Sequence, residues 1–92
     1  MAKSGKITVA AAGSAVALGT QTINGPLAVK ALAGNSGLVY LGDDGSGDVN
    51  SSSGFELSAK EEIRLDYVGS LASIMLDAAV NGEGVCWLAL NL

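Results

Sequence analysis

The sequence predicts an all-β fold: a single-domain β-sandwich, jelly-roll-like, with seven or eight short antiparallel strands. Three observations lead to this fold class. Short runs alternate between apolar and polar residues, as strands with one buried face do. Clusters of Gly, Asn, Asp and Ser interrupt these runs about every 8 to 12 residues, a spacing typical of sandwiches. The chain has 92 residues, a length typical of one domain.

Two strands are predicted near the N-terminus. Residues 6–10 alternate and contain three β-branched side chains, which indicates a strand. Gly13-Ser14 breaks this run, and residues 15–18 form a second short strand. Residues 19–26 end in Asn-Gly-Pro, a sequence typical of a turn, because Asn and Gly accept positive φ and Pro fixes its own.

Two further strands precede the middle of the chain. Residues 27–33 alternate between two faces, and the stretch between Pro26 and Gly34 is short for a helix. We therefore expect a strand there. Residues 38–41 are all apolar, which predicts a strand buried on both faces or lying at a subunit contact.

A long polar loop opens the second half of the chain. Residues 42–54 are mostly Gly, Asp and Ser and are too many for a hairpin turn, so we expect an exposed loop. Residues 55–57 form a short strand. Ser58 and Glu61 have capping-box spacing, which would favour a helix. The alternation over residues 63–67 is the longer pattern, however, and it favours a turn followed by a strand.

The end of the chain predicts a hairpin. Residues 71–80 contain one strand, and Asn81-Gly82-Glu83-Gly84 is a strong turn signal. We expect residues 78–80 to pair across this turn with the apolar run of residues 85–90.

Composition indicates that the chain relies on partner subunits. A chain of this length buries only about 60 to 65% of its unfolded surface, so its core is marginal. A single cysteine excludes an internal disulfide, and the lack of His and of a Cys cluster excludes a structural zinc. Charged residues make up 15% of the chain, against about 25% in typical domains. We therefore expect an oligomer, with a monomer of ordinary mixed surface as the alternative.

The charge distribution sets apart the first residues. The formal net charge is −4, which is the wrong sign for neutralising phosphates, so we expect no nucleic-acid partner. Lys3 and Lys6 nevertheless fall within the first six residues. The sequence therefore predicts an N-terminal arm over residues 1–6 and a β-sandwich domain over residues 7–92. A merely solvated terminus is the alternative.

We expect no membrane partner. No apolar run approaches the roughly 18 residues of a membrane span. Residues 7–18 are interrupted by Thr, Gly and Ser and lack the order of a signal peptide, so we expect a chain made and used without export.

The chemistry of catalysis is missing from the sequence. Without His there is no Ser-His or Cys-His pair, and Cys86 lies on a predicted apolar strand, which favours a core position. Asp43, Asp44 and Asp48 could suggest a glycosidase, but paired carboxylates need a rigid cleft. The loop also lacks the Gly and Glu positions of a calcium loop. We expect no enzyme, no catalytic or metal-binding residue, no cofactor and no small-molecule substrate.

The aromatic residues are scattered among different predicted strands, and they are Tyr40, Phe55, Tyr67 and Trp87. A stacking platform for nucleic acid or sugar would need several on one face. Core or interface anchors are the better interpretation, and we place Tyr40 and Trp87 at an oligomer interface.

A pattern of small and apolar residues, in the order of strands, Gly-Ser loop and turn, covers most of the chain. Its segments are 13–18, 38–43, 51–57, 62–66, 73–74 and 82–85. This pattern resembles the small capsid decoration proteins of tailed bacteriophages, also called cement or head-stabilising proteins. In similar phage proteins Pro-Gly usually occupies the turn where this chain has Ala59-Lys60, a departure that leaves the helix alternative open.

The resemblance implies a structural virion protein. Such proteins form a homotrimer on the outer capsid surface, at threefold or quasi-threefold positions, and hold the major capsid protein lattice against the pressure of packaged DNA. It also implies synthesis in the host cytoplasm. No binding residue can be carried over by motif. Because the N-terminal cations contrast with the acidic body, we expect Lys3, Ser4 and Lys6 to contact the capsid.

Two other functions remain as alternatives. A host-surface or carbohydrate-binding β-sandwich module of a phage particle would use the loop of residues 42–54 as its contact. A small hydrolase would use the carboxylates of the same loop.

Overall fold

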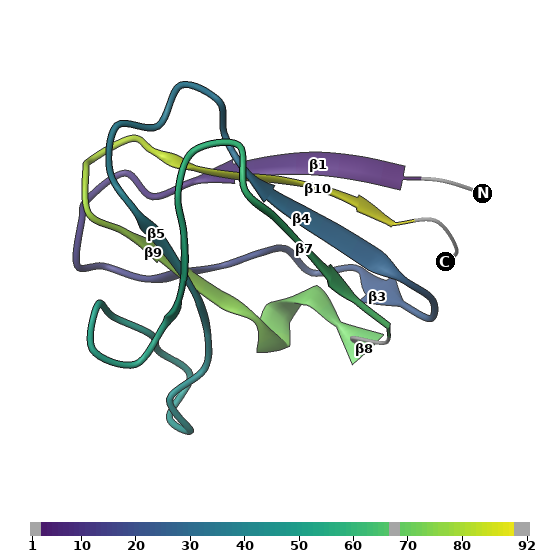
Figure 1. The fold of residues 1–92 in the computed structure, drawn as a ribbon. Coiled ribbons are helices and arrows are strands. Elements are labelled where there is room, and N and C mark those ends of the chain that lie inside the picture. The colour runs from purple at the N-terminus through teal and green to yellow at the C-terminus, as the bar shows by residue number, and fades with distance from the viewer. Residues whose placement is uncertain (1–2, 67–68, 90–92) are drawn as a thin grey trace.

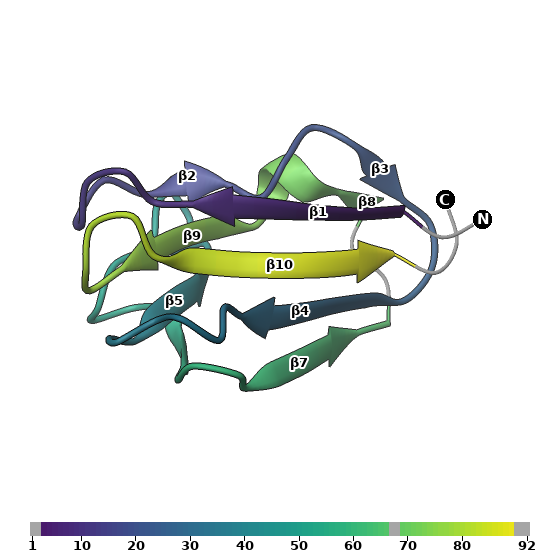
Figure 2. The same cartoon turned by 90° about the horizontal axis from the view of Figure 1, so that it is seen from above.

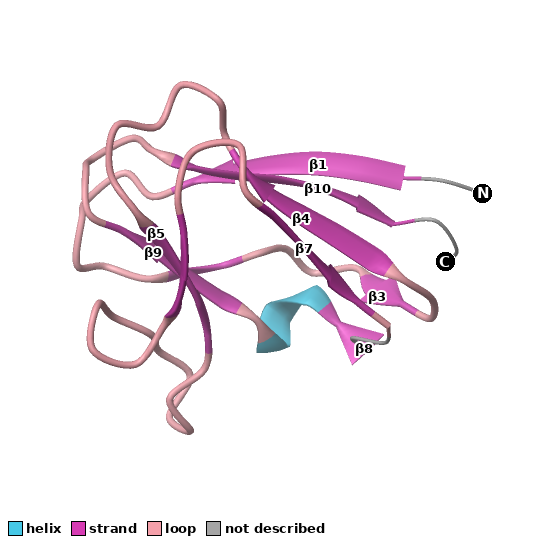
Figure 3. Ribbon diagram, viewed as in Figure 1, coloured by secondary structure: helices cyan, strands magenta, loops and turns pink. Residues whose placement is uncertain are grey.

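The computed structural model describes residues 3–66 and 69–89 (Figure 1). These residues form only strands, loops and one 3-10 helical turn (Figure 3). The all-β prediction is therefore confirmed. The elements are β1 (Lys3–Thr8), β2 (Val16–Ala17), β3 (Thr22–Ile23), β4 (Leu27–Ala31), β5 (Val39–Gly42), β6 (Phe55–Leu57), β7 (Glu62–Leu65), β8 (Gly69–Ser70), η1 (Leu71–Ser73), β9 (Met75–Ala78) and β10 (Gly84–Ala89).

The strands pair from the ends of the chain inward. The first strand, β1, pairs with the last, β10, and β2 pairs with β9. In the same way β3 pairs with β8, β4 with β7, and β5 with β6, and every pair is antiparallel. The chain is thus folded like one long hairpin whose tip is the loop between β5 and β6. Two further pairings, β4 with β10 and β5 with β9, join parts of this ribbon side by side.

The ribbon forms two four-stranded sheets in a sandwich-like arrangement. Sheet A has the order β1-β10-β4-β7, and sheet B has the order β2-β9-β5-β6. The short β3-β8 pair stands apart from both. Figure 2 looks down on sheet A, with the strands of sheet B behind it. Because both sheets contribute side chains to one hydrophobic cluster, the described residues share a single core.

Alternation along the strands determines which side chains enter the core. In β4 the side chains of Leu27, Val29 and Ala31 are buried and Lys30 is exposed, as the sequence pattern predicts. Sheet B supplies Val39 and Leu76, which are both fully buried. The two apolar layers together remove water from the space between the sheets, which is the main favourable contribution to folding.

The predicted N-terminal arm needs correction over residues 3–6. These residues belong to β1 and pair in register with β10, from Lys3 opposite Ala89 to Lys6 opposite Cys86. Ser4 and Gly5 have low strand propensity, so the sequence does not predict a strand at these residues. Pairing with β10 stabilises the strand instead. Residues 1–2 of the predicted arm lie outside the described residues.

The predicted C-terminal hairpin is wrong. The strand before the turn, β9, belongs to sheet B, whereas β10 belongs to sheet A, so the two strands do not pair with each other. Gly82 does form a turn with φ of +83°. Its N–H donates to the carbonyl oxygen of Val9 at 2.7 Å, and the Val9 N–H donates to the Glu83 carbonyl oxygen. Val9, the residue that follows β1, thus holds the connection, which carries the chain from one sheet to the other.

The segment after β6 is a turn, as expected, and not a helix. The Glu61 N–H donates to the Ser58 carbonyl oxygen at 3.0 Å, and the Glu61 carboxylate accepts from the Ser58 N–H at 2.7 Å. The capping-box spacing therefore stabilises a tight turn. Lys60 adopts a φ of +72°, the left-handed conformation that Gly adopts readily.

Two short strands lie where the sequence predicted only turns. These are β3, within residues 19–26, and β8, within the Gly69-Ser70 break. Each has two residues, and their pairing is long-range, Thr22 with Ser70 and Ile23 with Gly69. Such short ladders carry no periodicity in the sequence, so pattern analysis cannot detect them.

Candidate interaction surface

The outer face of sheet A presents two rows of side chains that run across the four strands. The first row contains Lys6, Cys86, Lys30 and Glu62, and the second contains Ser4, Leu88, Ala28 and Arg64. These residues alternate along their strands with side chains that point into the core. We call these eight residues the outer face.

The middle of the outer face is apolar and hollowed. Leu88 is 41% exposed, and among the large apolar side chains of the described residues only Phe55 is more exposed. Cys86 and Ala28 flank it, and these residues line an open hollow of about 570 Å³. The middle of the outer face is therefore the candidate contact surface of the described residues.

Cys86 was predicted to lie in the core, and this prediction is wrong. Its side chain is partly exposed on the outer face, with the sulfur 3.7 Å from the carbonyl oxygen of Lys30. Its neighbours Val85 and Trp87 occupy the inward positions of β10. Because the residues on both faces of this strand are apolar, the sequence does not show which of them point into the core.

The outer face is basic although the chain is acidic. It carries Lys6, Lys30 and Arg64 against one acid, Glu62, which gives it a formal charge of +2. The whole chain has a formal charge of −4, so the remainder carries −6. Two of the predicted capsid-binding residues, Ser4 and Lys6, lie on this face, while Lys3 is on the opposite side of β1.

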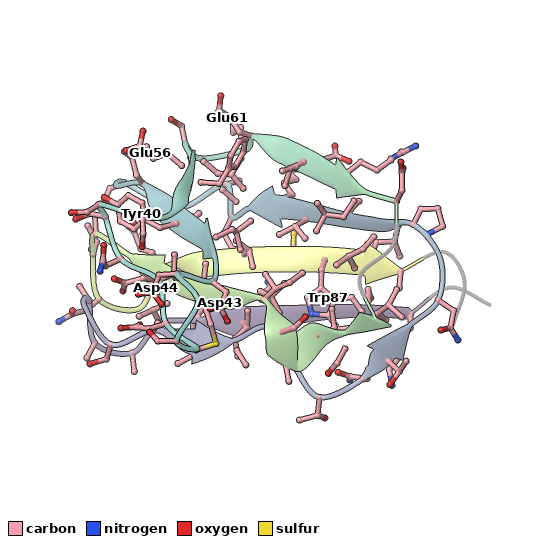
Figure 4. The ribbon with its side chains drawn as sticks, turned by 90° about the horizontal axis from the view of Figure 1, so that it is seen from below. Tyr40, Asp43, Asp44, Glu56, Glu61 and Trp87 are labelled. Carbon is pink, nitrogen blue, oxygen red and sulfur yellow. The ribbon has the colours of Figure 1, made fainter. Side chains whose placement is uncertain are left out.

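The two aromatic residues that we placed at an oligomer interface are instead buried within the chain. Trp87 is 5% exposed and belongs to the core cluster, and Tyr40 is 8% exposed (Figure 4). A Cβ at Gly5 would lie 2.7 Å from the Trp87 ring, so the glycine lets β1 cross the indole closely. Phe55, in contrast, is 57% exposed at the edge of sheet B.

The acidic loop between β5 and β6 uses its carboxylates to hold its own backbone. The Asp43 carboxylate accepts from the N–H groups of Gly45 at 2.7 Å and Gly47 at 3.1 Å. The Asp44 carboxylate accepts from the hydroxyl and N–H of Ser46, and these bonds hold the pKa of Asp44 below its ordinary value. Val49 is buried and anchors the loop. The loop is exposed, as predicted.

The acidic side chains of this region lie away from the outer face. Asp43, Asp44 and Asp48 are exposed in the loop, and Glu56 is exposed on β6. We call these four residues the acidic surface. Figure 1 shows the loop on the opposite side of the molecule from sheet A, and Figure 4, which views the molecule from below, shows Asp43 and Asp44.

The described residues contain no group of three or more His, Cys, Asp or Glu side chains that could hold a metal ion. The loop carboxylates are turned toward their own amides rather than toward a shared cleft, so they do not form the rigid pair that a glycosidase needs. Within residues 3–66 and 69–89, no helix is long and apolar enough to cross a membrane.

A second, apolar opening lies between the two sheets at their β6 and β7 edges. It measures about 300 Å³, and its lining is formed by Leu41, Gly42, Phe55, Ile63, Leu65 and Ile74. Several of these side chains pack against the core, so the opening is the exposed margin of that core.

Comparison with known proteins gives no relative for this chain. No family model, no curated protein and no solved structure matches it.

Proposed function

We propose that this chain is a structural virion protein that binds the outer capsid surface of a tailed phage. In this proposal it acts as a homotrimer at threefold or quasi-threefold positions and stabilises the lattice of the major capsid protein against internal DNA pressure. It is made in the host cytoplasm, and it has no catalytic activity.

The observation that carries the proposal is the outer face of sheet A. A small domain with Leu88 exposed at the centre of a hollowed sheet face is built to contact another protein. The acidic loop, the other prominent feature, directs its carboxylates to its own backbone. The features of the described residues therefore favour a binding role over a chemical one.

The pairing of the strands adds support from the fold. Strands that pair first with last, and so on inward, give a ribbon that rolls into two facing sheets. This is the arrangement expected of a jelly roll, a fold found in viral capsid domains. It agrees with the sequence resemblance to phage decoration proteins, although a fold alone does not determine a function.

The carbohydrate-binding alternative has less support. Sugar-binding platforms use exposed aromatic faces, and among the described aromatic residues only Phe55 is exposed, while Tyr40 and Trp87 are buried. Tyr67 lies outside the described residues. A glycan array would favour this alternative if the chain bound sugars selectively.

The proposal is tested by the stability of phage heads. Expanded heads that lack decoration protein, made from the phage genome that encodes this chain, are heated with and without the purified protein. We expect added protein to raise the temperature at which the heads release their DNA, because many weak contacts act together on one lattice. Heads already saturated with the protein serve as the control. An unchanged release temperature at saturating protein would contradict the proposal.

A further inference from the structure

The outer face of sheet A and the acidic surface are complementary in charge and lie on different sides of the molecule. The outer face carries +2, and the acidic surface, Asp43, Asp44, Asp48 and Glu56, carries −4. The β5–β6 loop projects away from sheet A (Figure 1), so one copy of the chain cannot bring the two surfaces together. A second copy can.

We propose that the outer face of sheet A binds the acidic surface of a second copy of this chain, in a head-to-tail contact. This inference rests on the proposed function, because it assigns the outer face to the contact between subunits of the proposed oligomer and leaves the other surfaces of that oligomer to face the capsid. It concerns the chain's contact with itself, so it can fail while capsid binding holds.

Contact between two outer faces is disfavoured. A symmetric dimer would bring the lysines of one outer face, Lys6 and Lys30, close to those of the other, and like charges facing each other across an interface disfavour the complex. A contact between different surfaces avoids this repulsion. Such a contact forms a ring, of which a trimer is the smallest after the dimer, when the rotation between neighbouring copies closes on itself, and it forms an open filament otherwise.

The apolar centre gives the contact its affinity, and the charges give it orientation. Leu88 is 41% exposed, and Cys86 is partly exposed beside it. Covering these side chains removes apolar surface from water, while Lys6 and Lys30 at either side of Cys86 select an acidic partner.

Charge reversal tests the contact. The variant Lys6→Glu with Lys30→Glu makes the outer face acidic. Analytical ultracentrifugation in low salt should then show a dissociation constant at least about tenfold higher than that of the native chain. The matched control is Lys3→Glu with Lys60→Glu, which makes the same change in net charge at exposed lysines off the outer face. The control should retain the native dissociation constant, and circular dichroism confirms that both variants are folded.

A compensating variant makes the test specific. Adding Asp48→Lys and Glu56→Lys to the reversed outer face, which carries −2, brings the acidic surface from −4 to 0 and removes the repulsion between the two surfaces. Self-association should then be at least several-fold tighter than that of the reversed variant. The inference is overturned if the native chain is monomeric at all concentrations, if the reversed variant associates like its control, or if the folded compensating variant associates no more tightly than the reversed variant.

The accessibility of the Cys86 thiol provides a test of the contact in the native chain, without any substitution. As the single cysteine, it lies at the centre of the outer face, so a maleimide should label it several-fold more slowly in the assembled state than after dilution to the monomer. A labelling rate independent of protein concentration would contradict the contact.

Head binding is measured separately for each variant. If the reversed variant keeps its oligomeric mass but loses binding to undecorated heads, the outer face binds the coat protein, so this inference fails while the proposed function stands. If the native chain self-associates as described yet ignores heads, the proposed function fails and the inference stands.

Discussion

At two positions the surrounding structure restricts which amino acid can be accommodated. Gly84 begins β10 opposite Thr8, and a Cβ at Gly84 would overlap the carbonyl oxygen of Ile7 and lie 2.7 Å from the Cα of Thr8. Both obstacles belong to the backbone of β1, which cannot move without breaking its pairing. At Lys60 the requirement concerns conformation instead of space, because its φ is +72°.

The substitution Gly84→Ala should therefore destabilise the fold strongly. We expect the free energy of unfolding to fall by about 3 kcal/mol, because the added methyl group forces β1 away from β10. Chemical denaturation measures this change. Gly34→Ala is the matched control, since a Cβ there meets no atom within 4 Å. Equal stability of the two variants would contradict the described close approach of β1 and β10.

The substitution Lys60→Gly should stabilise the chain. A left-handed conformation costs a non-glycine residue about 1 to 2 kcal/mol, part of which is offset by the greater freedom of Gly in the unfolded chain. We expect a gain of about 0.5 to 1 kcal/mol in the free energy of unfolding. Ala59→Gly, at the adjacent turn position without positive φ, should lose stability instead. A loss at both positions would show that Lys60 is not held in this conformation.

At the scale of elements, the connections between strands determine how the sheets meet. The turn between β9 and β10 joins sheet B to sheet A, and it also holds the connection between β4 and β5. Its Glu83 carboxylate accepts from the N–H of Ser36 at 2.7 Å, from the N–H of Gly37 at 2.9 Å and from the Ser36 hydroxyl at 2.9 Å. These bonds, with Ser36 the largest contributor, hold the pKa of Glu83 below its ordinary value.

This lowered pKa predicts how stability depends on pH. A carboxylate with a lower pKa in the folded than in the unfolded chain adds stability above its unfolded pKa, about 4.3 for glutamate. That stability is lost as the pH falls through the folded pKa. Thermal unfolding of Glu83→Gln should therefore show a lower Tm than the native chain at pH 7, and the difference should shrink as the pH falls below about 4.

The control for this prediction is Asp66→Asn, because the Asp66 carboxylate is exposed, accepts no hydrogen bond among the described residues and lies on neither proposed contact surface. Its Tm should follow the native curve closely over the same pH range. A Glu83→Gln variant with a constant Tm difference down to pH 3 would mean that the bonds to Ser36 and Gly37 do not depend on the charge of Glu83.

The strands were predictable from the sequence where side chains alternate, and their partners were not. Residues 27–33 and 63–67 gave β4 and β7 because one face of each is apolar. The turn at Gly82 was also recognised, yet the strands on either side of it enter different sheets. Turn chemistry specifies a change of direction, whereas pairing depends on distant strands, so a local pattern could not distinguish a hairpin from a crossing between sheets.

The candidate surface was only partly predictable for the same reason. Lys6 was singled out by its charge and Ser4 as its neighbour in the same segment, and both lie on the outer face. Cys86 and Leu88 were not, because an apolar run such as β10 does not reveal which side faces the core until its partner sheet is known. The opposite mistake was made for Trp87, which we expected at an interface and which is buried in the core beneath Gly5.

At the scale of the whole molecule, charge and apolar surface are separated. The chain is acidic overall, while one face of sheet A is basic at its edges and apolar at its centre. The charge of this 9.1 kDa chain is therefore unevenly distributed. Its basic face attracts acidic partners, and the rest of its surface repels them. This polarity suits a subunit that repeats across a surface.

The mass of undecorated phage heads, measured by charge-detection mass spectrometry before and after incubation with the protein, tests the central claim most directly. The proposed function predicts a saturable gain in mass that corresponds to three chains of 9.1 kDa at each occupied threefold or quasi-threefold position. Folded protein at saturating concentration that adds no mass to the heads would contradict it.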